Sequence, residues 1–189
     1  MFYKRVNDRI ELRLLQLNDA EELFALTDAN RDYLRVWLPW LDAINSVTDT
    51  KKFIDSTLEA IANQRSFVAA ICDQDSIVGL IGYNHIDSQN RIGYIGYWLA
   101  ENERGKGIMT TSCQAMIDYG FTTLNLNRLV IACATENKAS RAIPERLGFS
   151  YEGTAREAEW LYDRFVNHEI YALLYEDWQS RSTPLPHLR

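Results

Sequence analysis

Hydrophobic and polar residues alternate along this chain with two different periods. Residues 10–15 (IELRLL) alternate one by one, as a half-buried strand does. Residues 18–38 have apolar residues at helical spacing, and Asn18 or Asp19 can cap that helix, which we expect to break near Asn30. Thr48 opens a second predicted helix. The apolar faces of the two helices carry Leu23, Leu26, Leu34 and Leu38, and Phe53, Ile54, Leu58 and Ile61.

The rest of the chain alternates between predicted strands and helices. Residues 66–72, 76–86 and 91–100 read as three antiparallel strands, because turn signals (DQDS and DSQN) separate them. A helix is predicted over 108–124, a buried strand over 128–134 and a short helix that Gly148 ends. Residues 150–160 and 167–178 make the closing strands. This order predicts an α/β domain with a mixed sheet.

The length of the chain favours a single domain. A chain of 189 residues can bury one good core, and we expect residues 1–178 to form it. The segment 179–189 carries two prolines and should be a weakly ordered C-terminal tail.

Charge and cysteine content narrow the function classes. The formal net charge is −6 without a long basic cluster, which argues against a partner that is a nucleic-acid polymer or an anionic membrane. No apolar run approaches the roughly 18 residues of a spanning helix, and the N-terminus lacks a signal-peptide segment. Cys72, Cys113 and Cys133 lie too far apart for a zinc pattern or a disulfide framework. We therefore expect a cytoplasmic protein without a metal.

Two closely spaced glycines follow the third predicted strand. Glycine weakens both strands and helices, so another reason is needed for their presence. Gly105 and Gly107 lie between the apolar run that ends at Leu99 and the helix that begins near Ile108. Unpaired N–H groups at the positive end of that helix suit a phosphate or pyrophosphate, and Arg104 adds charge. The Walker and dinucleotide patterns fit worse, since neither the Gly-Lys-Ser/Thr sequence nor the third glycine is present. A plain tight turn is the alternative.

A second motif gives the loop its context. Residues 137–149 (NKASRAIPERLGF) come directly after the next strand. Strand, glycine loop, helix, strand, Asn-x-x-Ser helix and Gly-Phe together resemble the GCN5-related N-acetyltransferase (GNAT) family, over residues 10–178. Within it, YLRVWLPWL and IGYWL are most similar to the Rim-type ribosomal-protein N-terminal acetyltransferases. That subgroup includes the acetyltransferase domain of the microcin C self-immunity protein.

The resemblance implies a fold and a co-substrate. The GNAT fold would have a mixed, mostly antiparallel central sheet of about seven strands flanked by about four helices. Acetyl-CoA would place its pyrophosphate on the glycine loop and its pantetheine along the end of the third strand, where Asn137 would hydrogen-bond it. The implied cofactor-binding residues are Tyr97, Trp98, Leu99, Arg104, Gly105, Lys106, Gly107, Ile108, Met109, Thr110 and Asn137.

The chain departs from the family where many members carry a catalytic tyrosine. Seven residues after Asn137 stands Pro144, which should loosen the helix near Ser140. The family pattern then leaves Ser140 to stabilise or protonate the departing thiolate. The alternative is that Ser140 only bonds a nearby carbonyl. Glu159 matches the glutamate that activates the amine in the Rim-type enzymes, while His85 or a water chain is a second candidate for the base.

The sequence says least about the molecule that accepts the acetyl group. Trp40 and Phe53 flank the loop between the first two helices, where they are either core anchors or two walls of a slot for a flat group. We expect an acceptor with an α-amino group: a peptide N-terminus or an aminoacyl-nucleotide, the latter implying toxin or antibiotic self-immunity. A polyamine or other small amine, and a non-catalytic acetyl-CoA sensor, are the alternatives. The protein is expected to be a monomer or homodimer.

Overall fold

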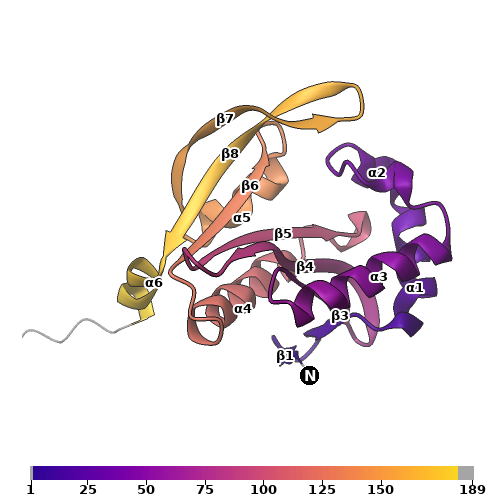
Figure 1. Cartoon of the computed structure of the whole chain (residues 1–189), viewed down its shortest axis with the longest axis horizontal. Coiled ribbons are helices and arrows are strands. Elements are labelled where there is room, and N and C mark those ends of the chain that lie inside the picture. The colour runs from indigo at the N-terminus through magenta and orange to yellow at the C-terminus, as the bar shows by residue number, and fades with distance from the viewer. Residues whose placement is uncertain (1, 183–189) are drawn as a thin grey trace, which may run out of the picture.

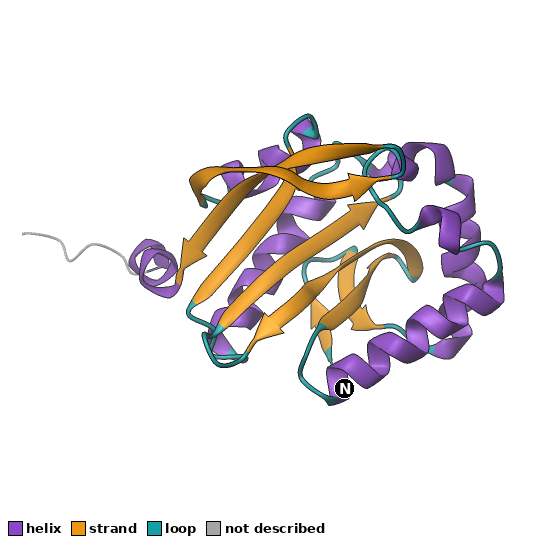
Figure 2. Cartoon of the chain, turned by 45° about the horizontal axis from the view of Figure 1, so that its top comes forward, coloured by secondary structure: helices purple, strands orange, loops and turns teal. Residues whose placement is uncertain are grey.

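One mixed sheet runs through the computed structural model, which describes residues 2–182 (Figures 1 and 2). Within these residues eight strands pair in the order β1-β2-β3-β4-β5-β6-β8-β7. All neighbours are antiparallel except β5 and β6, which are parallel. The strands are β1 (Tyr3–Arg5), β2 (Ile10–Leu14), β3 (Phe67–Asp73), β4 (Ser76–Asp87), β5 (Ile92–Leu99), β6 (Arg128–Ala134), β7 (Ser150–Leu161) and β8 (Arg164–Leu174).

Helices cover both faces of one half of the sheet and a single face of the other half. Side chains of α1 and α3 pack on β3 and β4 from one side, while those of α4 pack from the opposite side. Helix α5 contacts β6, β7 and β8. The α-helices are α1 (Ala20–Ala29), α2 (Arg31–Arg35), α3 (Val47–Ala62), α4 (Ile108–Thr122), α5 (Lys138–Arg146) and α6 (Tyr175–Ser182), with 3-10 turns at Leu17–Asp19, Leu41–Ala43 and Glu101–Glu103.

The predicted α/β fold is confirmed, with two additions. Strand β1 pairs with β2 as a hairpin, so the described sheet has eight strands rather than about seven. The last predicted strand ends at Leu174, and α6 continues into the segment expected to be weakly ordered. Residues 183–189 of that segment lie outside the described residues. None of the described helices is long and apolar enough to cross a membrane.

The predicted helix boundaries hold with small shifts. The first predicted helix does break at Asn30, between α1 and α2. Helix α3 begins one residue earlier than expected, because the Ser46 side chain rather than Thr48 caps it, accepting a hydrogen bond from the Asp49 N–H. Asp19 does not cap α1, since its carboxylate is held by the Arg13 guanidinium at 2.7 Å.

Candidate active site

The two parallel strands at the centre of the sheet separate partway along their length. Pairing between β5 and β6 covers only Ile92–Ile95 opposite Arg128–Ile131. Beyond that point the end of β5 leaves β6, and a cavity of about 770 Å³ opens beside it. Its walls are Tyr97–Leu99, the glycine loop, the first turns of α4 and α5, and several residues of α2 and the residues just after it. The family resemblance implied that a pantetheine would lie along this end of the strand.

The glycine loop forms one end of this cavity. Gly105 and Gly107 have φ angles of 74° and 79°, in the left-handed region that favours glycine. A Cβ atom built at either position would meet no atom within 4 Å, so the space in front of the loop is open. Gly107 immediately precedes α4, whose first N–H groups have no partner inside the helix. The residues present therefore fit a phosphate group at this point.

Charged side chains near the loop differ in where they point. The Arg104 guanidinium lies 5.2 Å from the centre of the Tyr33 ring, and both residues line the cavity. Arg146 on α5 also lines it and donates a hydrogen bond of 2.9 Å to the Thr110 hydroxyl. Lys106 instead pairs with Glu103 at 2.9 Å and is not among the lining residues. Sequence reasoning missed Tyr33 and Arg146 because each lies far from the glycine motif along the chain.

Ser140 and Tyr97 meet at the inner end of the cavity. Pro144 has no N–H, so the carbonyl of Ser140, four residues earlier, lacks its helical partner. The Tyr97 hydroxyl donates to that carbonyl at 3.0 Å, and the Ser140 hydroxyl lies 3.4 Å from the same phenol oxygen. The proline thus couples the Ser140 turn to β5, where the sequence predicted only a loosened helix.

Asn137 has a structural role in addition to the ligand contact that the resemblance implied. Its side-chain oxygen accepts a hydrogen bond of 3.1 Å from the Ser140 N–H and so caps α5. The oxygen therefore positions Ser140, and contact with a ligand is left to the amide nitrogen. Asn137 and Ser140 both line the cavity, as their spacing predicts.

Two buried cysteines lie near the same place. Burial raises the pKa of the Cys133 thiol to about 11, although a hydrogen bond with Ser140 lowers this pKa in part. Burial alone raises the pKa of Cys113 to about 12. Both thiols are therefore protonated at neutral pH, which fits packing rather than a nucleophile. Burial also raises the pKa of Tyr97 well above that of a free phenol, so its hydroxyl remains a donor.

A second cavity of about 350 Å³ adjoins the first on the other side of β5. Leu38, Tyr97 and Trp98 line both cavities, so the two meet at the end of this strand. Trp40 and Phe53, predicted to hold the acceptor, both line the second cavity, and each is half-buried. The remaining walls are mainly aliphatic: Leu23, Ile44, Val68, Leu80 and Ile81, with Thr27, Thr50, Gly82, Asn84 and Gly96.

His85 does not line either cavity. A bulge in β4 leaves Asn84 without a partner across the ladder, between the Tyr83–Ile95 and His85–Tyr94 pairs. The Asn84 amide lies so close over Gly96 that a Cβ there would come within 2.2 Å of it, which explains this glycine. Asn84 therefore lines the second cavity, while His85 is exposed and lies against the Tyr94 ring.

Glu159 has a partner that the sequence did not reveal. The His168 Nε2 lies 3.2 Å from a Glu159 carboxylate oxygen, and both side chains are partly buried. A second bulge brings them to one face, because residues 156–158 of β7 lie opposite the single residue Asn167 of β8. The Asn167 side chain holds that bulge by accepting from the Glu157 N–H at 2.8 Å.

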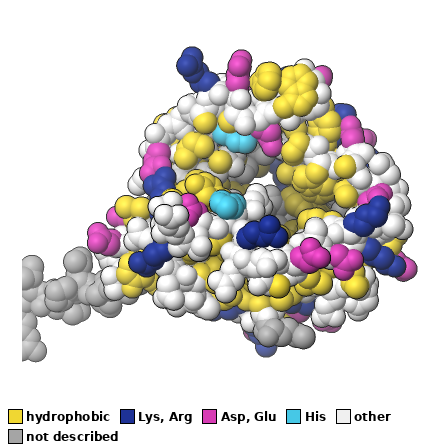
Figure 3. Space-filling model, in the orientation of Figure 1, with side chains coloured by type: hydrophobic (Ala, Val, Ile, Leu, Met, Phe, Trp, Pro, Cys, Tyr) yellow, Lys and Arg dark blue, Asp and Glu magenta, His cyan; other side chains and the backbone are white. Residues whose placement is uncertain are grey.

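The Glu159–His168 pair lines neither cavity, and the side of the hairpin on which it lies follows from its neighbours on β8. On β8 the neighbouring residue, Glu169, points to the other face, where Thr135 and Thr154 hydrogen-bond it. Cys133, opposite Glu169, packs into the core cluster that includes Ile143 of α5. The face that carries His168 is therefore turned away from α5. Figure 3 shows the molecule hollowed at its centre, with hydrophobic side chains gathered on the walls.

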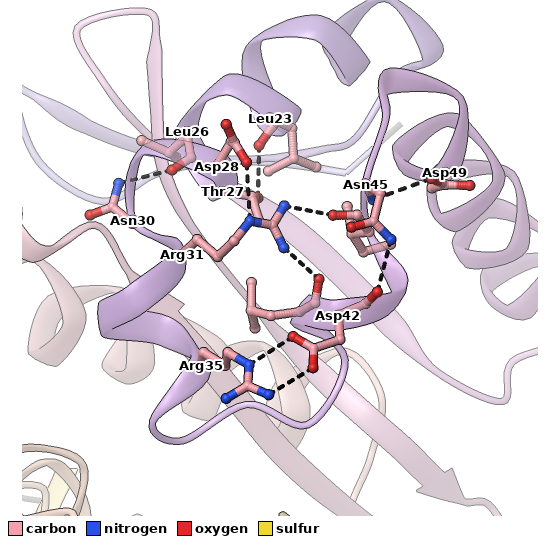
Figure 4. A network of polar contacts seen from close by, with 12 residues as sticks. Leu23, Leu26, Thr27, Asp28, Asn30, Arg31, Arg35, Asp42, Asn45 and Asp49 are labelled. Carbon is pink, nitrogen blue, oxygen red and sulfur yellow. Dashed lines mark hydrogen bonds and ion pairs between the residues drawn. The ribbon is translucent and has the colours of Figure 1, made fainter. Parts of the chain in front are cut away.

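The loop over residues 36–46, which carries Trp40, is fixed by a polar network (Figure 4). The Arg31 guanidinium donates to the carbonyls of Leu41 and Ile44, both at 2.7 Å, and to the Asp28 carboxylate at 3.0 Å. Arg35 forms two hydrogen bonds with the Asp42 carboxylate, at 2.7 and 2.8 Å. These contacts make the loop a defined wall. Within the described residues there is no group of three or more histidine, cysteine or acidic side chains that suits a metal ion.

Comparison with known proteins identifies relatives of this site and fold. A family model described as "Acetyltransferase (GNAT) domain" matches residues 9–150. The putative ribosomal N-acetyltransferase YdaF of Bacillus subtilis (strain 168) is 37% identical over 95% of this chain and 99% of its own. The microcin self-immunity acetyltransferase MccE, solved with acetyl-CoA and AMP, is 32% identical with a TM-score of 0.85, covering 89% of this chain and 94% of that one.

A further solved structure fits still better in shape. RimL, a ribosomal α-N-protein acetyltransferase solved in complex with coenzyme A, has a TM-score of 0.90 and is 28% identical. The match covers 93% of this chain and 99% of that one.

Proposed function

Because the chain belongs to the GNAT family of acetyltransferases and is an N-acetyltransferase that uses acetyl-CoA, we propose that its acceptor is the α-amino group of a protein N-terminus. The observation that carries the proposal is the meeting of two cavities at Tyr97. One has the open glycine loop at its end, and the other is an apolar pocket under Trp40. A thioester and an amine can therefore approach each other from opposite sides of β5.

The first cavity is suited to acetyl-CoA, which supplies an activated acetyl group as a thioester. The loop at Gly105 and Gly107 would hold the pyrophosphate, with Arg104 and Arg146 adding positive charge. Tyr97–Leu99 would accompany the pantetheine, since the end of β5 has no strand beside it. This arrangement directs the acetyl end toward Ser140 and Tyr97.

Ser140 is the proposed general acid. Its backbone N–H is held by the Asn137 cap, and its hydroxyl lies 3.4 Å from the Tyr97 hydroxyl. A positioned hydroxyl can donate a hydrogen bond to the thiolate as the carbon–sulfur bond breaks. The hydrogen bond from the Tyr97 hydroxyl to the Ser140 carbonyl supports this role. It fixes the backbone at Ser140, and Ser140 still lines the cavity.

Glu159 is the proposed base. An α-amine has a pKa near 8, so it is partly neutral at physiological pH and needs only a modest base or a water chain. The carboxylate lies on the face of the β7–β8 hairpin that is turned away from α5, and His168 Nε2 lies 3.2 Å from it. His168 can orient the carboxylate and pass a proton onward to solvent.

An aminoacyl-nucleotide is the second candidate acceptor. Trp40 and Phe53 line one apolar pocket and are only half-buried, which suits stacking on a nucleobase. MccE, the relative solved with AMP, supports this alternative. RimL and YdaF carry ribosomal names and support the peptide, which we place first.

Mass detection of acetylated products separates the candidates. Purified protein and acetyl-CoA are incubated with peptides that have free or blocked N-termini, with an aminoacyl-nucleotide analogue and with spermidine. We expect acetylation of the free peptide terminus and none of the blocked peptide. Preference for the nucleotide would favour the second candidate, turnover of spermidine alone would favour a polyamine enzyme, and binding of acetyl-CoA without any product would favour a sensor.

A further inference from the structure

The second cavity has bare backbone on part of its floor, with one side-chain amide lying across it. Gly82 on β4 and Gly96 on β5 are paired in the ladder, and both line the cavity. The amide of Asn84, the bulged residue of β4, lies over Gly96. A Cβ atom at Gly96 would come within 2.2 Å of the amide nitrogen and 2.6 Å of the amide oxygen. Packing against the β5 backbone therefore holds the Asn84 amide in place.

The Asn84 amide has no hydrogen-bond partner among the described residues. Two other polar side chains of the cavity are already paired. The Thr27 hydroxyl donates to the Leu23 carbonyl at 2.8 Å, and the Tyr97 hydroxyl donates to the Ser140 carbonyl at 3.0 Å. Asn84 is exposed, so a ligand that enters the cavity can reach it. In an apolar pocket, a few such polar groups fix the orientation of the ligand.

The place of the amide along β5 matches the start of a peptide chain. Gly96, beneath the amide, directly precedes Tyr97, at which the two cavities meet. One residue of a strand spans roughly 3.3 Å, which is also the spacing of successive main-chain nitrogens in an extended peptide. An α-amine can therefore lie at Tyr97 while the next main-chain N–H lies at Asn84. A lysine ε-amine stands at the end of a long alkyl chain, and spermidine has no amide, so neither fills both positions.

We propose that Asn84 determines specificity by binding the second residue of an extended peptide acceptor, accepting a hydrogen bond from its main-chain N–H and donating one to its C=O. These two groups of one residue point to the same side of an extended chain, as they do in a strand ladder. The inference rests on the proposed acetylation of a protein N-terminus and names the part of the acceptor that is recognised. An alkyl amine leaves the amide unpaired and is disfavoured for that reason.

The proposal is tested with two bisubstrate probes that differ at one position. In each, coenzyme A is joined through an acetyl linker to the α-amine of the same short peptide. In the second probe an ester oxygen replaces the first peptide N–H. We expect the wild type to bind the amide probe about fivefold more tightly or more, because the ester leaves the oxygen of Asn84 without a donor. Calorimetry measures both dissociation constants without turnover.

Asn84→Leu removes the donor and the acceptor and keeps a side chain of similar size over Gly96. In this variant we expect the two probes to bind within about twofold of each other, with acetyl-CoA bound as in the wild type. Asn18→Leu is the matched control, since Asn18 is exposed and lines neither cavity, and it should keep the wild-type ratio. Melting curves check folding, and Asn84→Ala replaces Asn84→Leu in the comparison if that variant does not fold.

The outcomes separate this inference from the proposed function. Probes that bind more tightly than coenzyme A, but equally to each other, contradict the role of Asn84 and leave the peptide acceptor standing. A preference for the amide probe that persists in Asn84→Leu also contradicts that role. Probes that bind no more tightly than coenzyme A alone contradict the peptide acceptor itself, and with it the inference.

Discussion

Ser140 shows how one residue in this site depends on several others. Its place on the Asn-x-x-Ser helix, and the disturbance from Pro144, can be predicted from the sequence because both act within one turn. The hydrogen-bond partner of the Ser140 carbonyl cannot be predicted in this way, since Tyr97 lies 43 residues earlier on another element. For the same reason His168 was not predicted as the neighbour of Glu159, whose contact depends on the register of two strands.

Removal of the Ser140 hydroxyl tests its role in the chemical step. Ser140→Ala keeps the helix and its cap, because Asn137 binds the backbone N–H rather than the side chain. Loss of a general acid typically lowers the rate by about 10²- to 10⁴-fold. We expect the turnover number to fall in this range while the dissociation constant for acetyl-CoA, measured by calorimetry, stays constant. Full turnover in this variant assigns the acid role to water or another group.

Glu159→Gln tests the base. The amide cannot accept the amine proton, so kcat should fall by about 10²-fold or more at neutral pH. Because an α-amine has a pKa near 8, a larger neutral fraction at higher pH should restore part of the rate. A pH–rate profile of wild type and variant measures this difference. His85→Ala is the matched control, since His85 is exposed and lies against the Tyr94 ring, and an equal loss there would favour His85 as the base.

At the scale of elements, local periodicity predicts most strands and helices, but not their irregularities. The break at Asn30 and the start of α4 after Gly107 were predicted because the signals are local. The bulges at Asn84 and at residues 156–158 were not, because a bulge is defined only against the partner strand. The bulge at Asn84 decides that Asn84 rather than His85 lines the second cavity, and the bulge at residues 156–158 decides that Glu159 and His168 lie on one face.

The glycine loop is tested by a pair of substitutions at Gly107. A Cβ there meets no protein atom, so added bulk occupies only the space assigned to the phosphate. Gly107→Val should weaken acetyl-CoA binding by more than about tenfold, through bulk and through its left-handed backbone. Gly107→Asn controls for the backbone, because asparagine tolerates this conformation. In a calorimetric titration we expect the Gly107→Asn protein to bind acetyl-CoA more tightly than the Gly107→Val protein. Wild-type affinity in a folded Gly107→Val protein contradicts the assignment.

The loop over residues 36–46 is tested at Arg31. Arg31→Met keeps much of the side-chain length but removes the donors to the Leu41 and Ile44 carbonyls. A loosened loop should raise the Michaelis constant for the acceptor by about three- to tenfold, with a smaller effect on acetyl-CoA. Arg5→Met, at an exposed arginine outside both cavities, is the control. Equal kinetic constants in all three proteins would show that the loop keeps its shape without this network.

For the whole molecule, the order of the elements along the chain follows from the sequence except at the two ends of the chain. The antiparallel trio β3–β5 and the buried strand β6 were predicted because these strands are apolar and turn signals bound the first three. Strand β1 has three exposed residues and forms only against β2, so it carries no signal of its own. Helix α6 was read as part of the closing strand, although its Trp178 and Tyr175 pack against Phe121 of α4.

Stability at low pH is expected to depend on Glu169. Hydrogen bonds from Tyr151, Thr135 and Thr154 lower the pKa of Glu169 below its ordinary 4.5. The ionised form is therefore favoured by folding, so its contribution is present above about pH 4.5 and is lost as pH falls through the folded pKa. Melting curves should show a smaller difference between neutral and acid pH for Glu169→Gln than for the wild type. An unchanged pH dependence would show that other carboxylates govern acid unfolding.

Site-resolved mass spectrometry of one peptide tests the proposed α-amine acetylation most directly. The peptide carries a free N-terminus and an internal lysine, and it is incubated with the protein and acetyl-CoA labelled in the acetyl group. We expect the label on the α-amino group and none on the lysine, with the signal lost when Ser140→Ala replaces the wild type. Label on the lysine with a free α-amine, or no label while acetyl-CoA remains bound, would contradict the proposal.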